Sequence, residues 1–233
     1  MNNEPPPDYE VIIAGAGPTG LVAANLLGKS GIRTLLLEKR EEPYEIPRAI
    51  SFDDEVMRIF QAAGLHKKLQ HIAKPFPGLR LKSPDGRILL EITKKAFAGF
   101  APSWLFFQPE LEKALEEGLL SLPAVHLCRK CTVISANNED SGTRVVYTNQ
   151  SGKSCTVTAR FTIGCDGANS KFRAIAGARW KYLYFSSANL KIDISAKKPE
   201  TGLTDWIEKI CSPAKPVVYI NGRGNHFRCE AGI

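Results

Sequence analysis

The feature that most constrains this chain is a glycine-rich turn between two apolar segments near its start. The turn reads GAGPTG over residues 15–20, and Glu38 directly follows the second apolar segment. A strand, such a turn, a helix and a second strand closed by an acid make up the dinucleotide-binding fingerprint. Because these conditions hold together, residues 10–38 are predicted to form one compact βαβ unit, in preference to a turn that binds no nucleotide.

Each glycine of this turn has its own predicted role. Gly15 allows the tight turn, Gly17 lets backbone N–H groups approach a diphosphate, and Gly20 lets the helix pack closely on the strand. The helix N-terminus offers partial positive charge to phosphates, and Glu38 is placed to bind a ribose hydroxyl. Since a carboxylate there would repel a 2′-phosphate, the predicted ligand is FAD or NAD rather than NADP.

Hydrophobic patterns further along predict an α/β fold, in which a doubly wound parallel sheet is joined by an antiparallel sheet. The turn at residues 84–86 lies between two alternating segments and predicts a hairpin, which is foreign to a purely parallel sheet. Helices are predicted over residues 21–29, 53–63, 109–121 and 170–176. Strands are predicted over residues 11–14, 32–37, 79–82, 88–92, 125–127, 132–135, 144–148, 155–158, 161–164, 189–194, 217–220 and 226–230.

Composition narrows the classes to which the chain can belong. Its 233 residues are 43% apolar and 24% charged, as in ordinary globular proteins. The net charge of +7 is spread over scattered lysine pairs, which argues against a nucleic-acid partner. The start of the chain lacks a signal-peptide pattern, and no apolar run is long enough to span a membrane. We therefore expect a cytoplasmic protein without a membrane partner.

The six cysteines do not indicate a metal site. Cys128 and Cys131 are the only close pair, and neither a second cysteine pair nor a histidine pair accompanies them. They lie in a strand-like region rather than at a helix start, so thioredoxin-like chemistry is not expected either. Reduced, mostly structural thiols are predicted.

Four segments together resemble a known family. The runs GAGPTGLVAANLLGKSGIRTLLLEK, IPRAISFDDEVMRIFQAAGL, FFQPELEKAL and GCDGANSKFR are similar to the FAD-dependent aromatic hydroxylases, which are single-component flavoprotein monooxygenases. The similarity is greatest to the phenol and 3-(3-hydroxyphenyl)propionate hydroxylase branch, and it covers nearly the whole chain from residue 9. It implies a Rossmann-like FAD-binding domain with an antiparallel substrate domain.

This resemblance implies a division of the chain. Residues 1–8 are expected to form a flexible leader. The FAD-binding domain is expected to comprise residues 9–78 and 103–180. A partial substrate-binding antiparallel sheet is expected over residues 79–102 and 181–233.

The resemblance also assigns cofactor-binding residues beyond the glycine turn and Glu38. Arg48 would lie along the FAD diphosphate and ribityl chain, where a guanidinium fork suits two phosphate oxygens, although a surface arginine is the alternative. Gln108 would contact the linker of the flavin, or it could only cap the following helix. Asp166, with Ser170 and Arg173, matches a second motif associated with FAD and NAD(P)H; the alternative is a plain helix N-cap.

The chemistry implied is hydroxylation of a small aromatic substrate. NADH or NADPH would reduce the flavin, O2 would give a C4a-hydroperoxyflavin, and a phenol ring would take its distal oxygen. A base or donor near the phenolic oxygen is required, but no catalytic residue is assigned. His71, Tyr184, Tyr219 and His226 are candidates by chemistry alone, and a structural role is the more common one for each.

The sequence departs from the family in one respect. The hydroxylases carry a third motif, a Gly-Asp segment followed by a proline- and glycine-rich loop and a long helix, and this motif is absent. A truncated chain is therefore expected: a fragment, a shortened product, or a relative that pairs with another chain, with a homo-oligomer also compatible. The rival to an enzyme is an inactive FAD- or nucleotide-binding remnant, alone or with a partner. An NAD-dependent dehydrogenase is weaker, because Lys181 and Tyr182 have the wrong spacing for its catalytic pair.

Overall fold

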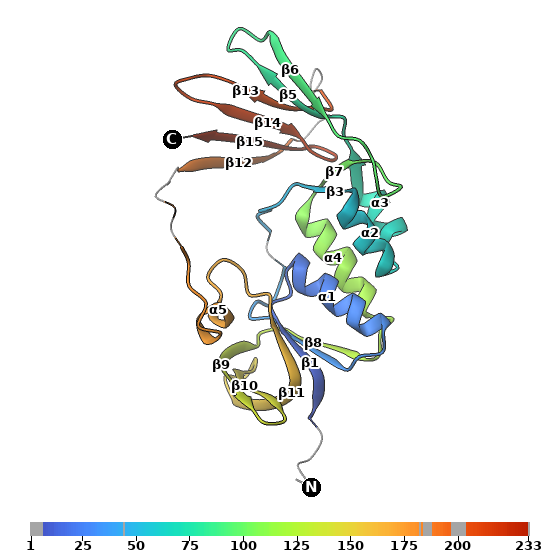
Figure 1. Cartoon of the computed structure of the whole chain (residues 1–233), viewed down its shortest axis with the longest axis vertical. Coiled ribbons are helices and arrows are strands. Elements are labelled where there is room, and N and C mark those ends of the chain that lie inside the picture. Colours follow the sequence, from blue (N-terminus) through green and yellow to red (C-terminus); the bar gives the residue numbers. More distant parts are fainter. Residues whose placement is uncertain (1–6, 44, 182, 184–187, 197–203, 233) are drawn as a thin grey trace. The chain divides into compact units, whose positions relative to one another are not determined.

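The computed structural model describes residues 7–43, 45–181, 183, 188–196 and 204–232. Contacts divide the chain into two compact units, one formed by residues 1–44 and 112–181 and the other by residues 45–111 and 182–233. Figure 1 labels most of the helices and strands of both units. Each unit is therefore assembled from two separate stretches of sequence.

The first unit is built on a six-stranded sheet with the order β8-β2-β1-β11-β10-β9. The first four of these strands run parallel, and β10 and β9 continue the sheet in antiparallel fashion. The elements are β1 (Tyr9–Ala14), α1 (Pro18–Lys29), β2 (Thr34–Leu37), β8 (Val125–Cys128), β9 (Thr132–Glu139), β10 (Gly142–Thr148), β11 (Ser154–Gly164) and α5 (Lys171–Ile175). The helix α4 (Gln108–Leu119) begins in the second unit and continues into the first.

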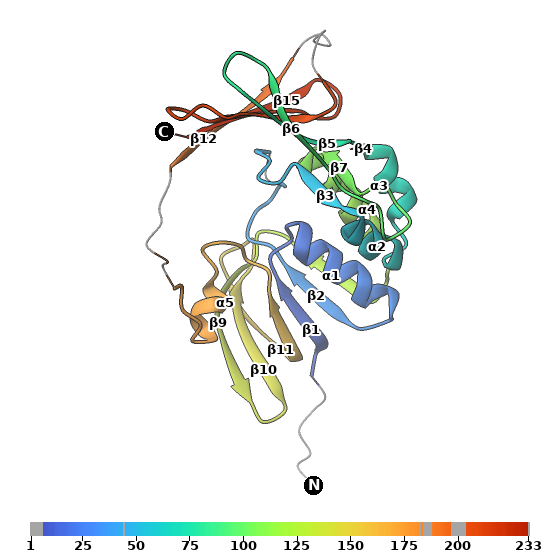
Figure 2. The same ribbon diagram turned by 45° about the horizontal axis from the view of Figure 1, so that its top comes forward.

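The predicted βαβ unit is confirmed, with α1 lying along β1 and β2 (Figure 2). Pro18 occupies the first turn of α1, where its missing N–H and fixed φ cost nothing. Gly31 has a φ of 73°, a left-handed conformation that lets the chain leave the helix and enter β2. The glycine and proline residues thus set both ends of the helix.

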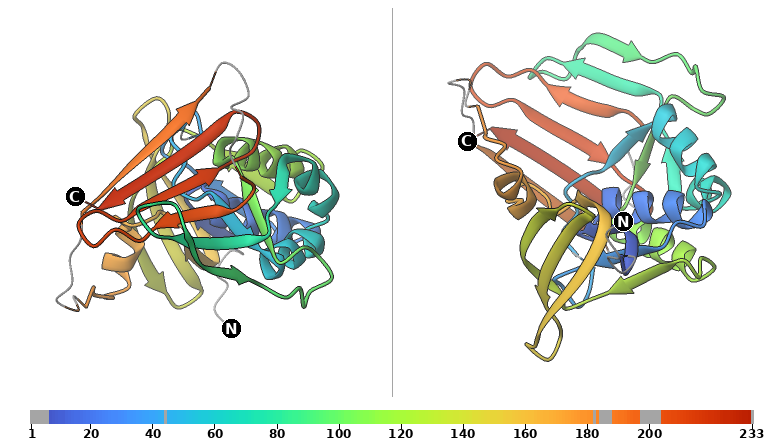
Figure 3. Two further views of the ribbon diagram at one scale, coloured as in Figure 1. Left: turned by 90° about the horizontal axis from the view of Figure 1, so that it is seen from above. Right: turned by 60° about the horizontal axis from the view of Figure 1, so that its bottom comes forward.

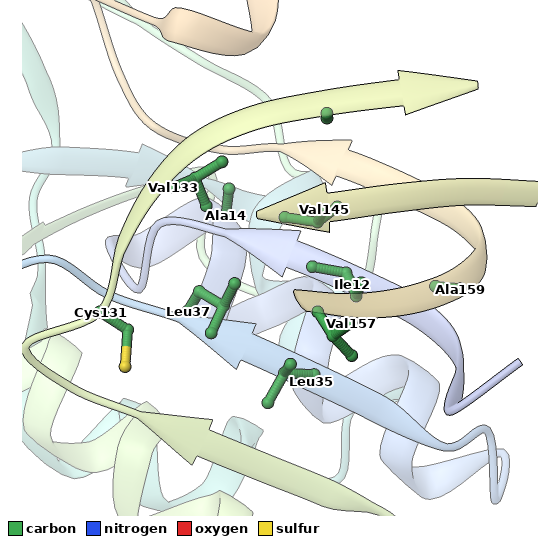
Figure 4. Packing of buried hydrophobic residues seen from close by; sticks show 10 residues of the cluster. Ile12, Ala14, Leu35, Leu37, Cys131, Val133, Val145, Val157 and Ala159 are labelled. Atoms are coloured by element: carbon green, nitrogen blue, oxygen red, sulfur yellow. The ribbon is translucent and has the colours of Figure 1, made fainter. Parts of the chain in front are cut away.

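A buried apolar cluster forms the main core of this unit (Figure 4). Ile12 and Ala14 of β1 and Leu35 and Leu37 of β2 share one face, because side chains of a strand alternate between its two faces. The neighbouring strands contribute the rest of the cluster: Cys131, Val133, Ala136, Val145, Val157 and Ala159. The last four residues of β1 and all of β2 are buried, and therefore on both faces, which explains their continuous apolar sequences.

The second unit contains a six-stranded sheet with the order β12-β15-β14-β13-β5-β6, whose strands lie side by side in Figure 3. All neighbouring pairs in it are antiparallel except β13 with β5. Its strands are β5 (Gly78–Lys82), β6 (Ile88–Thr93), β12 (Asn189–Ser195), β13 (Ile207–Ile210), β14 (Val217–Asn221) and β15 (His226–Gly232). The other elements are β3 (Ser51–Asp53), α2 (Asp54–Ala62), α3 (His66–Ile72), β4 (Ala73–Pro75) and β7 (Ser103–Phe106), and the order β3-β7-β4 forms a small sheet.

The structure differs from the sequence-based expectations in several elements. The helix α3 and the strands β3, β4, β7 and β13 were not predicted, and the segments 155–158 and 161–164 form one continuous strand, β11. The compact units group residues 45–78 and 103–111 with the second unit, and the predicted division into an FAD-binding and a substrate-binding domain stays a prediction. Which unit binds which ligand stays a prediction.

Over the described residues, the structure has no helix long and apolar enough to cross a membrane.

A buried amide joins α1 to α4. Asn25 is 1% exposed, and its side-chain N–H groups donate to the carbonyls of Leu21 and Leu115, both at 2.9 Å. Replacing Asn25 by alanine would leave the Leu115 carbonyl without this donor. We expect the Asn25→Ala variant to lose roughly 1–3 kcal/mol of unfolding free energy, measured by urea denaturation. The exposed Asn138, changed to alanine, is the control and should shift stability by less than about 0.5 kcal/mol.

Candidate functional site: a nucleotide-binding edge of the parallel sheet

The loops that follow β1, β2 and β11 meet at one edge of the sheet in the first unit. These strands are parallel, so their carboxyl ends lie together. The N–H of Gly15 donates to Leu37 at 2.8 Å, and the N–H of Cys165 donates to Ala14 at 2.7 Å. The chain leaves β1 for β2 on one side, while β11 pairs on the other side. In open α/β sheets, ligands bind in the crevice at such a switch point.

Two glycines of the turn are required by close backbone contacts. Gly15 has a φ of 103°, and a Cβ there would lie 2.4 Å from the carbonyl oxygen of Cys165. A Cβ on Gly20 would lie 1.8 Å from the carbonyl oxygen of Gly15. Both distances are far shorter than any that a real Cβ makes, so only glycine at these two positions permits the packing of loop and helix.

The remaining glycine of the turn, Gly17, faces open space. A Cβ on Gly17 would meet no atom within 4 Å, and the backbone there has a φ of −75°, which any residue can adopt. Gly17 is the N-cap of α1, and no side chain caps the helix. The first-turn N–H groups and the positive end of the helix dipole therefore lie beside space that a glycine keeps open. These residues fit a diphosphate.

Glu38 lies at the end of β2 and is already hydrogen-bonded to the turn. Its carboxylate accepts from the N–H of Ala16 at 2.7 Å through Oε2 and from the N–H of Arg40 at 2.9 Å through Oε1. Each carboxylate oxygen can accept a further bond, so ribose hydroxyls could still donate to the same group. The predicted partners, the glycine turn and the acid, are brought together by the structure.

The backbone of Glu38 is held by a turn from a distant part of the chain. Its N–H donates to Cys128 and its carbonyl accepts from Cys131, both at 2.9 Å. Lys130 in this turn has a φ of 56°. All six cysteines are free thiols, and burial raises the pKa of Cys128 and of Cys131. The two cysteines therefore contribute to the packing around the site, and neither is expected to be a reactive thiolate.

Asp166 follows β11 at the same edge, and its carboxylate caps α5. It accepts from the hydroxyl of Ser170 and from the N–H of Lys171 at 2.6 Å, and Ser170 in turn accepts from the N–H of Arg173 at 2.9 Å. Asp166 therefore caps the helix, which is one of the two roles that the sequence predicted for it. Its contact with a cofactor stays a prediction.

Arg48 and Gln108 lie together in the second unit. The side-chain oxygen of Gln108 accepts from the N–H of Arg48 at 2.8 Å and from the N–H of Ala49 at 3.0 Å. Gln108 is buried, whereas Arg48 is exposed. The amide thus fixes the peptide that carries the arginine, and contact of either residue with FAD stays a prediction.

A buried arginine that the sequence did not indicate supports the same peptide. Arg228 on β15 is 2% exposed, forms a two-pronged ion pair with Asp193 on β12, and donates to the carbonyls of Pro47 and Arg48. In the ladder of β12 and β15, Asp193 lies directly opposite Arg228. The sequence signal that could have indicated this ion pair is the presence of opposite charges on two predicted strands.

The four side chains considered as bases have different settings. His71 is exposed, and its carbonyl accepts from Arg223 at 2.8 Å. Tyr219 is 48% exposed on β14. His226 stacks on Phe107 with ring centroids 4.0 Å apart, and both rings line a narrow pocket of the second unit. Tyr184 lies outside the described residues. No base is singled out by these contacts.

A glycine turn, an uncapped helix start and an acid at a sheet switch point define a dinucleotide-binding protein of the Rossmann-like class. A family model described as "FAD binding domain" matches residues 8–228. The chain belongs to this family, whose cofactor is FAD. Contact of the glycine turn with FAD stays a prediction.

Curated relatives agree with this assignment. The chain is 34% identical over 215 residues to a probable NADH-specific resorcinol 4-hydroxylase of Rhodococcus jostii (strain RHA1), with 91% of this chain and 40% of the relative covered. It is 30% identical over 212 residues to a 3-(3-hydroxy-phenyl)propionate/3-hydroxycinnamic acid hydroxylase of Comamonas testosteroni, with 91% and 36% covered. The chain thus spans less than half the length of these relatives.

Solved structures share the fold. The p-nitrophenol 4-monooxygenase PnpA from Pseudomonas putida DLL-E4 matches with a TM-score of 0.87 at 20% identity, over 97% of this chain and 57% of that one. The flavin-dependent monooxygenase PieE, solved with FAD and substrate, matches with a TM-score of 0.81 at 20% identity, over 97% and 43%. The predicted α/β fold with an added antiparallel sheet is confirmed.

Two alanine substitutions separate packing from ligand binding. Gly20→Ala places a Cβ against the Gly15 carbonyl, and we expect a destabilisation at or above the upper end of roughly 1–3 kcal/mol. Gly17→Ala should fold with nearly unchanged stability, because its Cβ meets nothing, yet lose FAD affinity on the order of tenfold or more. Urea unfolding and calorimetric titration with FAD measure the two effects. Equal FAD affinity in Gly17→Ala and the parent chain would contradict this placement of the diphosphate.

Proposed function

We propose that this chain binds FAD and forms part of an FAD-dependent hydroxylase of small phenolic compounds, with NADH or NADPH as reductant and O2 as the oxygen donor. The observation that carries the proposal is the open space at Gly17, the N-cap of a helix start without a side-chain cap, next to Ala16, whose N–H donates to Glu38. Family membership and the names of the relatives support it.

The first unit would hold the adenosine diphosphate half of the cofactor. Backbone N–H groups at the start of α1 would bind diphosphate oxygens, because the helix dipole and orphan donors both favour an anion. Glu38 would accept from the ribose hydroxyls and, being anionic, would exclude a 2′-phosphate. Asp166 would border the same crevice while it caps α5.

The second unit would contribute Arg48 and the antiparallel sheet. The guanidinium of Arg48 would neutralise diphosphate charge, and the buried amide of Gln108 keeps its backbone in place. The sheet of β12, β15 and β14 would bind the aromatic substrate and exclude water from the reacting atoms. When bound, FAD would supply the redox chemistry with NAD(P)H and O2, which side chains alone cannot perform.

The role proposed for Glu38 is tested by removing its carboxylate. Glu38→Ala should weaken FAD binding on the order of tenfold to a hundredfold, since a hydrogen bond to a charged group contributes about 1.5–3 kcal/mol. It should also reduce the discrimination against adenosine 2′-phosphate ligands. Calorimetry with FAD and with 2′,5′-ADP measures both.

A neighbouring acid provides the control for this test. Glu41 is exposed and pairs with Lys130, so Glu41→Gln should bind FAD like the parent chain. Unchanged FAD affinity in Glu38→Ala would show that the ribose does not contact this acid.

The enzymatic proposal is tested separately from binding. The purified chain should show the visible absorption bands of bound flavin and, with a panel of phenols, should consume NADH or NADPH and yield a product with one added hydroxyl. Flavin bands without product would support the inactive FAD-binding alternative. A folded, colourless chain that takes up no added FAD would contradict both.

A further inference from the structure

The charged side chain with the lowest exposure among those described has no role in the function proposed so far. Arg228 is 2% exposed and extends from β15 to Asp193 on the adjacent strand, with Nε to Oδ1 at 2.8 Å and Nη2 to Oδ2 at 3.1 Å. Its remaining N–H groups donate to two backbone carbonyls, that of Arg48 at 3.1 Å and that of Pro47 at 2.5 Å. A buried guanidinium is expensive to desolvate, and it is tolerated here because its donors have partners.

The peptide that Arg228 contacts is also held by a second buried side chain. Gln108 accepts from the N–H groups of Arg48 and Ala49, so Gln108 binds the donors of this peptide while Arg228 binds its acceptors. Arg228 and Gln108 lie far apart in sequence and belong to different elements. Residues 47–49, a segment without regular structure, are therefore fixed from both directions.

We propose that Arg228, oriented by Asp193, is a positioning residue that holds the peptide of Arg48 so that its guanidinium is presented to an anionic diphosphate. The proposal rests on the function proposed above, in which Arg48 binds the FAD diphosphate. A side chain on an ordered backbone loses less conformational freedom on binding than one on a loose loop. The buried arginine thus acts on the affinity for the cofactor without touching it.

The test is a double-mutant cycle on the full 233-residue chain, with the dissociation constant for FAD measured by calorimetry. Arg228→Met should weaken FAD binding on the order of tenfold, within the range of coupling seen between residues of one network. Arg48→Met should weaken it by at least as much. If Arg228 acts through Arg48, the double variant should bind FAD no more weakly than Arg48→Met alone.

Conservative variants and a matched control keep this test independent of folding. Arg228→Lys retains the charge but not the fork, and should bind FAD with an affinity between the parent chain and Arg228→Met. Asp193→Asn should weaken binding in the same direction but less. Arg80→Met removes an arginine paired with Glu91 on the far strands of the same sheet, and should leave FAD affinity unchanged.

A readout without FAD reports on the peptide itself. Hydrogen exchange at the amides of Arg48 and Ala49 should accelerate in Arg228→Met and stay at the parent rate in Arg80→Met. Thermal unfolding of each variant shows whether the second unit is folded, and Arg228→Lys and Asp193→Asn provide the test if Arg228→Met does not fold.

The outcomes distinguish this inference from the proposed function. Losses of FAD affinity that multiply in the double variant, or unchanged affinity in both Arg228→Met and Arg228→Lys, would overturn the positioning role while leaving FAD binding intact. Absence of FAD uptake by the parent chain would overturn the proposed function itself. Non-additive losses together with faster exchange at Arg48 and Ala49 would support the positioning role.

Discussion

The proposed nucleotide-binding edge depends on the close approach of the start of α1 to the end of β1. This approach exists because Gly20 packs directly on the carbonyl of Gly15, a contact that no side chain permits. It brings the first N–H groups of the helix to the carboxyl edge of the sheet, where β2 delivers an acid and β11 delivers a second loop. Within the same turn, the N–H of Ala16 donates to the carboxylate of Glu38 at 2.7 Å.

The parts of the structure that the sequence revealed are those with strictly local requirements. The glycine turn, the proline in the first turn of α1 and the apolar strands on either side each impose their own conformation, so their pattern predicts the βαβ unit directly. The hairpin of β5 and β6 was predictable for the same reason, because residues 84–86 favour a turn wherever they occur.

The parts that escaped prediction depend on partners far away in the chain. β7 is buried along its whole length between β3 and β4, so it shows no alternation that would mark a strand. Arg228 looks like a surface residue of a strand, and only its pairing with Asp193 and with the carbonyls of Pro47 and Arg48 makes it internal. The compact units also divide the chain where residue patterns show no break, within α4.

The hydrogen bonds of Glu38 have one more consequence. Because the amides of Ala16 and Arg40 already orient its carboxylate, the acid would not need to be reordered to bind a nucleotide at the proposed site. The entropy of ordering the turn is therefore spent when the protein folds rather than when it captures its ligand. A preformed site of this kind would favour rapid association over induced fit, and the release rate would then set the lifetime of the complex.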